Sequence, residues 1–220
     1  MNADFLMLEM VSGQMKFAVS RRWLWLLMLA AVLAACGSKT PSLPRLGAGD
    51  VIVAFGDSLT FGTGAAEKDS YPAVLAQLTG RNVVRSGVPG ETSAQALQRL
   101  PGVLDEYKPK LVIVCLGGND MLRKHNETET ISNLRVIVRK VKDSGAAVML
   151  VGVPRPALLT SAPRFYEDIA REFGIPYEGA ALTSVLYKPE FRSDTIHPNA
   201  AGYRKIAEAL AELLRKAGAL

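Results

Sequence analysis

The segment VIVAFGDSLT, residues 51–60, places a serine at the point where a buried strand is expected to end. The apolar run 51–55 predicts a strand covered on both faces, and Gly56-Asp57-Ser58-Leu59 follows it directly. A hydroxyl at the carboxyl end of such a strand is held by the sheet and open to solvent, as a serine nucleophile requires. The same four residues could instead form an ordinary turn in which Asp57 or Ser58 caps the next helix.

A serine nucleophile needs a base and an orienting acid, and Asp194-Thr195-Ile196-His197-Pro198 offers both. Because the acid precedes the histidine by three residues, the Asp194 carboxylate can reach Nδ1 and leave Nε2 of His197 facing Ser58. The alternative is a helix-terminal carboxylate beside a surface histidine. The chain has 2 histidines, and His125 has no acid placed as Asp194 is. We therefore predict that His197 is the base.

Two further segments offer hydrogen-bond donors to an oxyanion. Gly117-Gly118-Asn119-Asp120 ends the apolar run 111–116, and the uncharged amide of Asn119 can donate to charge that develops only in the transition state. In the segment 86–93, Gly90 can present a backbone N–H that no side chain obstructs. Each has an ordinary alternative: a Gly-Asn turn, or a loop glycine needed for a positive φ.

Apolar runs alternate with helical periodicity along the rest of the chain, which indicates a parallel sheet covered on both faces. Right-handed crossovers place the loops that follow strands along one edge of the sheet. Ser58, Gly90 and Asn119 should therefore converge at the carboxyl ends of the first three strands. The expected strands are 51–55, 83–84, 111–116, 147–151 and 175–177, and the expected helices are 71–78, 93–104, 129–142, 164–173 and 200–216.

These four blocks, taken in order, resemble the consensus blocks of the SGNH superfamily of GDSL hydrolases. Within the superfamily they are most similar to the bacterial multifunctional thioesterases, lysophospholipases and arylesterases. The resemblance runs from about Asp50 to the C-terminus. It implies a single α/β domain with a flavodoxin-like, three-layer α/β/α fold and a mostly parallel five-stranded sheet, whose first strand lies between the second and third. One departure is Arg85 or Ser86, where family members commonly have asparagine.

The resemblance also implies the role of each site residue. Ser58 would be the nucleophile, His197 the base and Asp194 the orienting acid. The oxyanion donors would be the backbone N–H groups of Ser58 and Gly90 and the side chain of Asn119. The family chemistry requires no cofactor.

The first part of the chain resembles a bacterial lipoprotein signal. Residues 23–35 carry no charge and follow Arg21-Arg22, and this run is too short to span a bilayer. Leu33-Ala34-Ala35-Cys36 resembles a lipobox, which predicts cleavage before Cys36 and its lipidation. We therefore expect a signal peptide over 1–35, the lipidated cysteine and a tether over 36–49, and the hydrolase domain over 50–220. The alternatives are a signal anchor or a cleaved peptide that leaves a free cysteine, and Met15 is an alternative start to Met1.

The signal predicts a location in the bacterial cell envelope, with the enzyme anchored to a membrane and facing the periplasm. Gly37 stands where an aspartate often retains lipoproteins at the inner membrane, which leaves the outer membrane open to it. The formal net charge of +5 comes from interspersed residues of both signs, which argues against nucleic-acid binding. Cys115 lies in an apolar run and reads as a small core residue, and neither cysteine has zinc-ligand spacing. We expect no disulfide, no metal and no cofactor.

The predicted activity is hydrolysis of a carboxylic ester or thioester through an acyl-enzyme. The loop 152–159 offers apolar side chains to an acyl tail, or simply packs. One rival function keeps the triad and removes acetyl groups from envelope polysaccharide, which would need a shallow, polar cleft. Another is a non-catalytic envelope lipoprotein that only binds a ligand, and the intact Ser58, Asn119, Asp194 and His197 argue against it.

Overall fold

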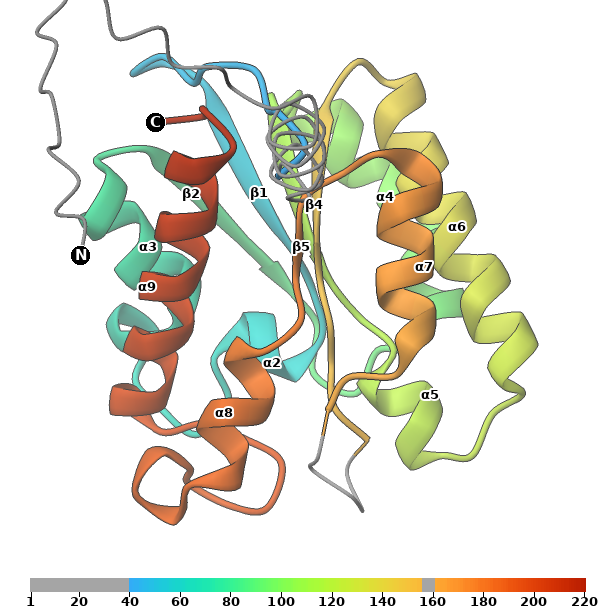
Figure 1. The fold of residues 1–220 in the computed structure, drawn as a ribbon, viewed down its shortest axis with the longest axis vertical. Coiled ribbons are helices and arrows are strands. Elements are labelled where there is room, and N and C mark those ends of the chain that lie inside the picture. Colours follow the sequence, from blue (N-terminus) through green and yellow to red (C-terminus); the bar gives the residue numbers. More distant parts are fainter. Residues whose placement is uncertain (1–39, 156–160) are drawn as a thin grey trace, which may run out of the picture. The chain divides into compact units, whose positions relative to one another are not determined.

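A parallel sheet of five strands forms the centre of this computed structural model, which describes residues 40–155 and 161–220 (Figure 1). The strand order is β2-β1-β3-β4-β5, and each neighbouring pair is parallel. The α/β class, the parallel sheet and the first strand between the second and third are therefore confirmed. The strands are β1 (Val51–Gly56), β2 (Asn82–Gly87), β3 (Leu111–Cys115), β4 (Ala147–Val151) and β5 (Tyr177–Glu178).

Five helices cover the two faces of the sheet (Figure 1). Helices α3 (Tyr71–Thr79) and α9 (Ala200–Lys216) pack together on one side. Helices α4 (Ser93–Tyr107), α6 (Glu127–Asp143) and α7 (Arg164–Phe173) lie side by side on the other. All five were expected from the sequence, and α7 and α9 have the expected bounds.

The short elements at the carboxyl edge were not expected. They are the helices α2 (Ser58–Phe61), α5 (Gly118–Leu122) and α8 (Ala181–Tyr187), and the 3₁₀ turns η1 (Glu67–Asp69) and η2 (Pro189–Phe191). A helix of one or two turns is too short to produce a recognisable hydrophobic period. Strand β2 is also longer than expected, because the polar Arg85 and Ser86 pair with Ala54 and Phe55 of β1.

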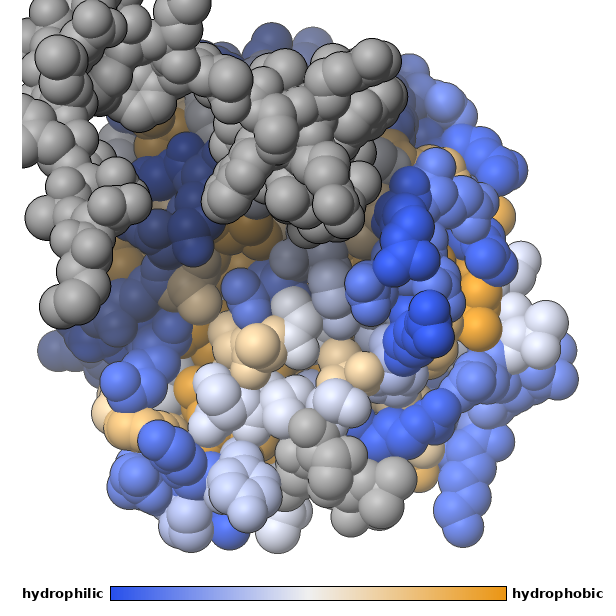
Figure 2. Space-filling model, viewed as in Figure 1, coloured by the Kyte–Doolittle hydropathy of each residue, from blue (hydrophilic) through white to orange (hydrophobic). Residues whose placement is uncertain are grey.

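The apolar runs form the core. The side chains of β1 from Ile52 to Phe55 and of β3 from Leu111 to Val114 are fully buried, and the two strands pair in parallel. Burying an aliphatic or aromatic side chain contributes about 1.5–3 kcal/mol, so these strands anchor the sheet. Cys115 is also buried, as expected of a core residue. The outer faces of α6 and α7 are mainly hydrophilic (Figure 2).

The described end of the predicted tether lies against the domain. The backbone N–H groups of Leu43 and Leu46 donate to the carbonyls of Ala217 and Ala219, beyond the end of α9, and the Leu46 side chain is buried. The predicted signal peptide and Cys36 lie outside the described residues, as do residues 156–159 of the loop that offers apolar side chains to an acyl tail or simply packs. Among the residues that the structure describes, no helix is both long and apolar enough to cross a bilayer.

Candidate active site

Ser58 is the first residue of α2, and one residue, Asp57, separates this helix from β1. Asp57 is the N-cap of this helix and accepts a hydrogen bond from the Leu59 N–H at 3.0 Å. The two sequence interpretations of this segment are thus compatible, because the aspartate caps a helix and the serine lies at the end of a strand. A Cβ at Gly56 would collide with the Thr60 hydroxyl and the Cys115 carbonyl, so only glycine fits where the chain turns from β1 into α2.

His197 and Asp194 lie beside Ser58. Nε2 of His197 is 3.0 Å from Oγ of Ser58, and Nδ1 is 2.8 Å from Oδ2 of Asp194. Oδ1 of Asp194 accepts from the backbone N–H groups of Ile196 and His197, both at 2.8 Å. Partial burial opposes ionisation of Asp194, but the bonds from the His197 ring and from these two N–H groups outweigh it and lower the pKa of the carboxyl. His125 lies elsewhere, in a second pocket.

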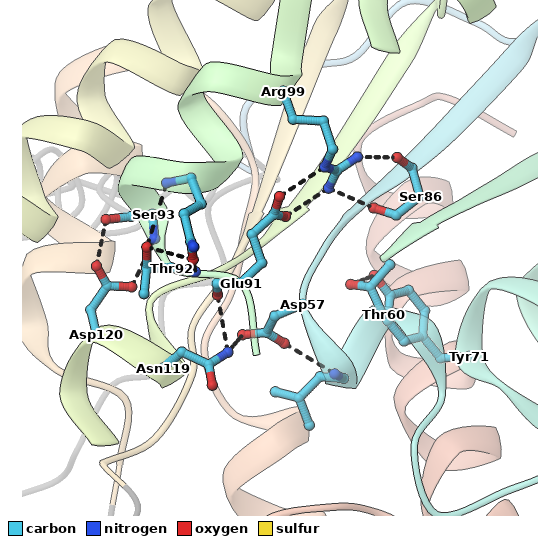
Figure 3. A network of polar contacts seen from close by, with 12 residues as sticks. Asp57, Thr60, Tyr71, Ser86, Glu91, Thr92, Ser93, Arg99, Asn119 and Asp120 are labelled. Carbon is cyan, nitrogen blue, oxygen red and sulfur yellow. Dashed lines mark hydrogen bonds and ion pairs between the residues drawn. The ribbon is translucent and has the colours of Figure 1, made fainter. Parts of the chain in front are cut away.

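Asn119, in the first turn of α5, faces two acceptors across the site. Its Nδ2 donates to Oδ2 of Asp57 at 3.1 Å and to the carbonyl oxygen of Glu91 at 3.0 Å (Figure 3). Gly117, which caps α5, has a φ of 104°, a conformation that glycine adopts readily. The predicted Gly-Gly turn is therefore present, and it leads directly into a helix.

Gly90 lies on the loop between β2 and α4. Its φ is 79°, a left-handed conformation that glycine adopts readily, so the alternative of a loop glycine needed for a positive φ holds here. Its carbonyl accepts from Nη2 of Arg123 at 2.7 Å. Among the described residues the Gly90 N–H has no hydrogen-bond acceptor.

An ion pair between the buried Glu91 and the partly buried Arg99 holds this loop and was not predicted from the sequence. Nε and Nη2 of Arg99 donate to the two carboxylate oxygens of Glu91 at 2.8 and 2.7 Å (Figure 3). Nη1 of Arg99 donates to the Ser86 hydroxyl at 2.8 Å, and its guanidinium lies over the Phe55 ring. Ser86, at the departure from the family pattern, lies near the end of β2 and is hydrogen-bonded to Arg99. No local sequence signal predicts such a contact between a loop and a helix.

A second carboxylate ties the loop to α5. Oδ2 and Oδ1 of Asp120 accept from the backbone N–H and hydroxyl of Ser93 at 2.9 and 2.6 Å (Figure 3). Ser93 begins α4, whose N-terminus is closed by a capping box between Thr92 and Gln95. Asp120 directly follows Asn119, and its bonds to Ser93 therefore hold α5 against the start of α4.

Asp57 is the most deeply buried acid of the site, with 2% of its surface exposed. Burial raises the pKa of this carboxyl to about 7, although the Leu59 N–H, His197 and the Asn119 amide all act in the opposite direction. Within residues 40–155 and 161–220, no lysine or arginine forms an ion pair with Asp57.

A narrow pocket of about 30 Å³ opens at Ser58 and His197. This volume holds only a few atoms. Val153 and Pro154 belong to the loop 152–159, for which contact with an acyl tail and plain packing were both open, and both line the pocket. Its remaining apolar walls are Leu59, Leu122, Leu186 and Ile196. Among the residues described, no group of three or more His, Cys, Asp or Glu side chains could hold a metal ion.

A hydroxyl, an imidazole and a carboxylate in one hydrogen-bonded series, at the carboxyl edge of a parallel sheet, form the arrangement of a hydrolase with a serine nucleophile. The sequence profile of the GDSL-like Lipase/Acylhydrolase family matches residues 54–205. The chain therefore belongs to this family and is a hydrolase of ester bonds.

Curated relatives agree with this assignment. The chain is 33% identical over 179 residues to thioesterase 1/protease 1/lysophospholipase L1 of Escherichia coli K12, covering 78% of this chain and 86% of the relative. It is 30% identical over 197 residues to the esterase TesA of Pseudomonas aeruginosa, covering 82% and 95%. It is 30% identical over 200 residues to an arylesterase of Vibrio mimicus, covering 86% and 98%.

Solved structures agree as well. The crystal structure of a TesA superposes with a TM-score of 0.66 at 28% identity, covering 76% of this chain and 98% of that one. The crystal structure of AlinE4, an SGNH-hydrolase family esterase, gives a TM-score of 0.59 at 31% identity, covering 79% and 98%. The chain thus shares both fold and family with this group of esterases.

Proposed function

We propose that this esterase acts through an acyl-enzyme, with Ser58 as nucleophile, His197 as general base and Asp194 as orienting acid. The observation that carries the proposal is the continuous series of hydrogen bonds from Asp194 through His197 to the Ser58 hydroxyl. The lowered pKa of Asp194 keeps this carboxylate ionised at neutral pH, as stabilisation of an imidazolium requires.

The proposed reaction has two halves. Oγ of Ser58 attacks the acyl carbonyl carbon while Nε2 of His197 takes the hydroxyl proton, and the carbonyl electron pair moves onto oxygen. Collapse of the tetrahedral intermediate releases the alcohol or thiol, which receives that proton, and leaves an ester on Ser58. Water then gives a proton to His197 and attacks this ester, and a second collapse frees the acid and returns the proton to Ser58.

The oxyanion would be bound by the backbone N–H groups of Ser58 and Gly90 and by the Asn119 amide. The unused N–H of Gly90 and the presence of Ser58 and Asn119 in one pocket support this assignment. Both amide hydrogens of Asn119 already have acceptors, Asp57 and the Glu91 carbonyl. Asn119 would therefore act by sharing the hydrogen now directed at the neutral Glu91 carbonyl, because a developing oxyanion is the stronger acceptor.

The proposed substrates are carboxylic esters and thioesters with an apolar acyl group. Two features support this class: the apolar walls of the pocket, and the thioesterase, lysophospholipase and arylesterase activities named for relatives at 30–33% identity. The small volume beside Ser58 admits the first atoms of the acyl chain. A longer chain would continue past Leu122, which lines the pocket and is 44% exposed.

We also propose that the mature enzyme is attached to a membrane of the bacterial envelope by lipid on Cys36 and faces the periplasm. The uncharged run 23–35 and the lipobox-like Leu33-Ala34-Ala35-Cys36 support this location. More than one acyl chain on Cys36 would make the attachment stable, since each buried CH₂ contributes about 0.8 kcal/mol.

The test of the catalytic proposal is the hydrolysis of p-nitrophenyl esters from acetate to dodecanoate by the wild type and by Ser58→Ala. We expect turnover of acyl chains longer than acetyl by the wild type and near-background rates for the variant. Full activity of Ser58→Ala would refute the assignment of the nucleophile. Activity confined to acetyl esters would instead favour a deacetylase.

A further inference from the structure

The proposed triad does not use Asp57, although its carboxylate lies beside the nucleophile in the chain. Oδ1 of Asp57 accepts from the Leu59 N–H at 3.0 Å, which is an ordinary helix-capping bond. Oδ2 accepts from Nδ2 of Asn119 at 3.1 Å, across the gap between β1 and α5 (Figure 3). The second bond therefore joins the segment that carries Ser58 to the amide assigned above to the oxyanion.

The surroundings of Asn119 determine which way its amide points. A side-chain amide has a donor end and an acceptor end, and a half-turn about χ2 exchanges them. The nitrogen of Asn119 faces the Glu91 carbonyl, which can only accept, and Oδ2 of Asp57, which can only accept when this carboxyl is ionised. In the reversed orientation, the amide oxygen would face these two acceptor oxygens without a hydrogen between them. Asp57 in its ionised form thus excludes the reversed amide.

Capping alone does not account for an acid at this position. Asparagine and serine cap helices about as well as aspartate does, and neither would bring a buried charge. Asp57 is 2% exposed, and no described cation pairs with it, so its charge is a cost to folding. What the carboxylate adds over a neutral cap is a second acceptor oxygen, and that oxygen meets Asn119.

We propose that Asp57 is a positioning residue of this esterase, whose carboxylate holds the Asn119 amide with its N–H end in place before an oxyanion forms. Such preorganisation matters because a donor that must first reorient stabilises the transition state much less than one already in place. The inference rests on the proposed role of Asn119 as an oxyanion donor.

The test is Asp57→Asn, measured by steady-state kinetics and thermal unfolding. Oδ1 of the new side chain keeps the cap on Leu59, whereas its NH₂ group meets the NH₂ group of Asn119, and two donors cannot bond. The side-chain amide of Asn119 should then rotate by a half-turn about χ2. We expect kcat to fall by about 10²–10³, as for loss of an oxyanion donor, with KM within about twofold of wild type and no loss of melting temperature.

A double variant and a matched control separate this effect from general damage. Asp57→Asn/Asn119→Ala should be no slower than Asn119→Ala alone, because the two residues act through one bond. Asp50→Asn is the control, since the Asp50 carboxylate likewise accepts a backbone N–H, that of Gly47 at 2.7 Å, but lies outside the site. It should retain wild-type kcat. If Asp57→Asn proves unstable, Asp57→Ser retains a cap, removes the Asn119 contact and should show the same loss confined to kcat.

Each outcome decides a separate point. A near-wild-type kcat for Asp57→Asn, with a slow Asn119→Ala, would overturn the positioning role and leave the proposed mechanism standing. Additive losses in the double variant would overturn it too, because Asp57 would then act by another route. A wild-type kcat for Asn119→Ala would remove Asn119 from the proposed oxyanion hole, and the inference would fail with it.

Discussion

Nε2 of His197 lies 3.0 Å from Oγ of Ser58, although 139 residues separate them in the chain. The two residues come from opposite ends of the domain's sequence: Ser58 follows β1, and His197 lies on the loop before α9. The sheet and α9 therefore have to be packed together before the proposed nucleophile meets its base.

The proposed triad predicts strongly non-additive losses. Ser58→Ala and His197→Ala should each lower kcat by about 10⁴-fold or more, and the double variant should be no slower, because the residues act as one unit. His125→Ala is the matched control and should remain near wild type, since that histidine lies in a different pocket. Steady-state hydrolysis of one soluble ester measures all four. An inactive His125→Ala beside an active His197→Ala would reverse the assignment of the base.

Asn119→Ala should lower kcat by about 10²–10³ with little change in KM, the pattern of a donor used mainly in the transition state. Asn133→Ala is its control, because the Asn133 amide donates to the Ser93 hydroxyl in the neighbouring polar network, outside the pocket of Ser58. The same ester assay applies. A change confined to KM would mean that Asn119 only binds the ground state.

Removing the cation from the ion pair of Arg99 with Glu91 should destabilise the domain far more than removing it from a surface pair, because a buried carboxylate is left unpaired. Arg99→Met leaves Glu91, which is 6% exposed, without its cation, and should lower the free energy of unfolding by roughly 2 kcal/mol or more. Arg85→Met is matched to it, since Arg85 also lies over an aromatic ring but pairs with a Glu67 that is 78% exposed. That variant should lose less than about 1 kcal/mol. Urea denaturation compares them, and equal losses would contradict the prediction.

Asp57 should make the wild type less stable as pH rises. Its pKa is about 7 in the folded protein against an ordinary value of 3.8 for this side chain, so the folded state binds the proton more tightly than the unfolded chain does. The contribution of Asp57 to stability is therefore greatest below pH 4, falls between pH 4 and 7, and levels off above that. Relative to Asp57→Asn, which cannot titrate, the loss should reach at most about 4 kcal/mol. Melting temperatures of both proteins from pH 4 to 8 test the trend, and a constant difference would refute it.

Cys36→Ser should release the enzyme from the membrane without changing its kcat. The substitution removes the proposed site of lipidation, whereas the residues of the proposed active site all lie in the domain that the structure describes. Fractionation of cells that express either form, with mass spectrometry of the N-terminus, is the measurement. Soluble wild-type protein with an unmodified Cys36 would contradict the anchor and leave the esterase assignment intact.

Local sequence patterns predicted most of the fold, because most of its strands and helices have a clear run or period of apolar residues. The apolar runs of β1, β3 and β4 and the long helices α7 and α9 each carry enough residues for their period to be recognised. The 3₁₀ turns and the helices α2, α5 and α8 were missed because they are too short for that, and β2 was underestimated because its second half is polar.

The sequence alone determined which candidate site residues follow each strand. A serine follows the first strand, a glycine loop the second and an asparagine the third, and an acid and a histidine come near the end of the chain. Strand ends of a parallel sheet share one edge, so these residues had to come near one another. Only the tertiary structure decided which hydrogen bonds connect the segments that carry these residues. The bonds from Asp57 to Asn119, from Glu91 to Arg99 and from Asp120 to Ser93 depend on side-chain directions and depths that no sequence spacing encodes. Burial is likewise a property of the packed domain, and it is burial that makes the charge of Asp57 costly.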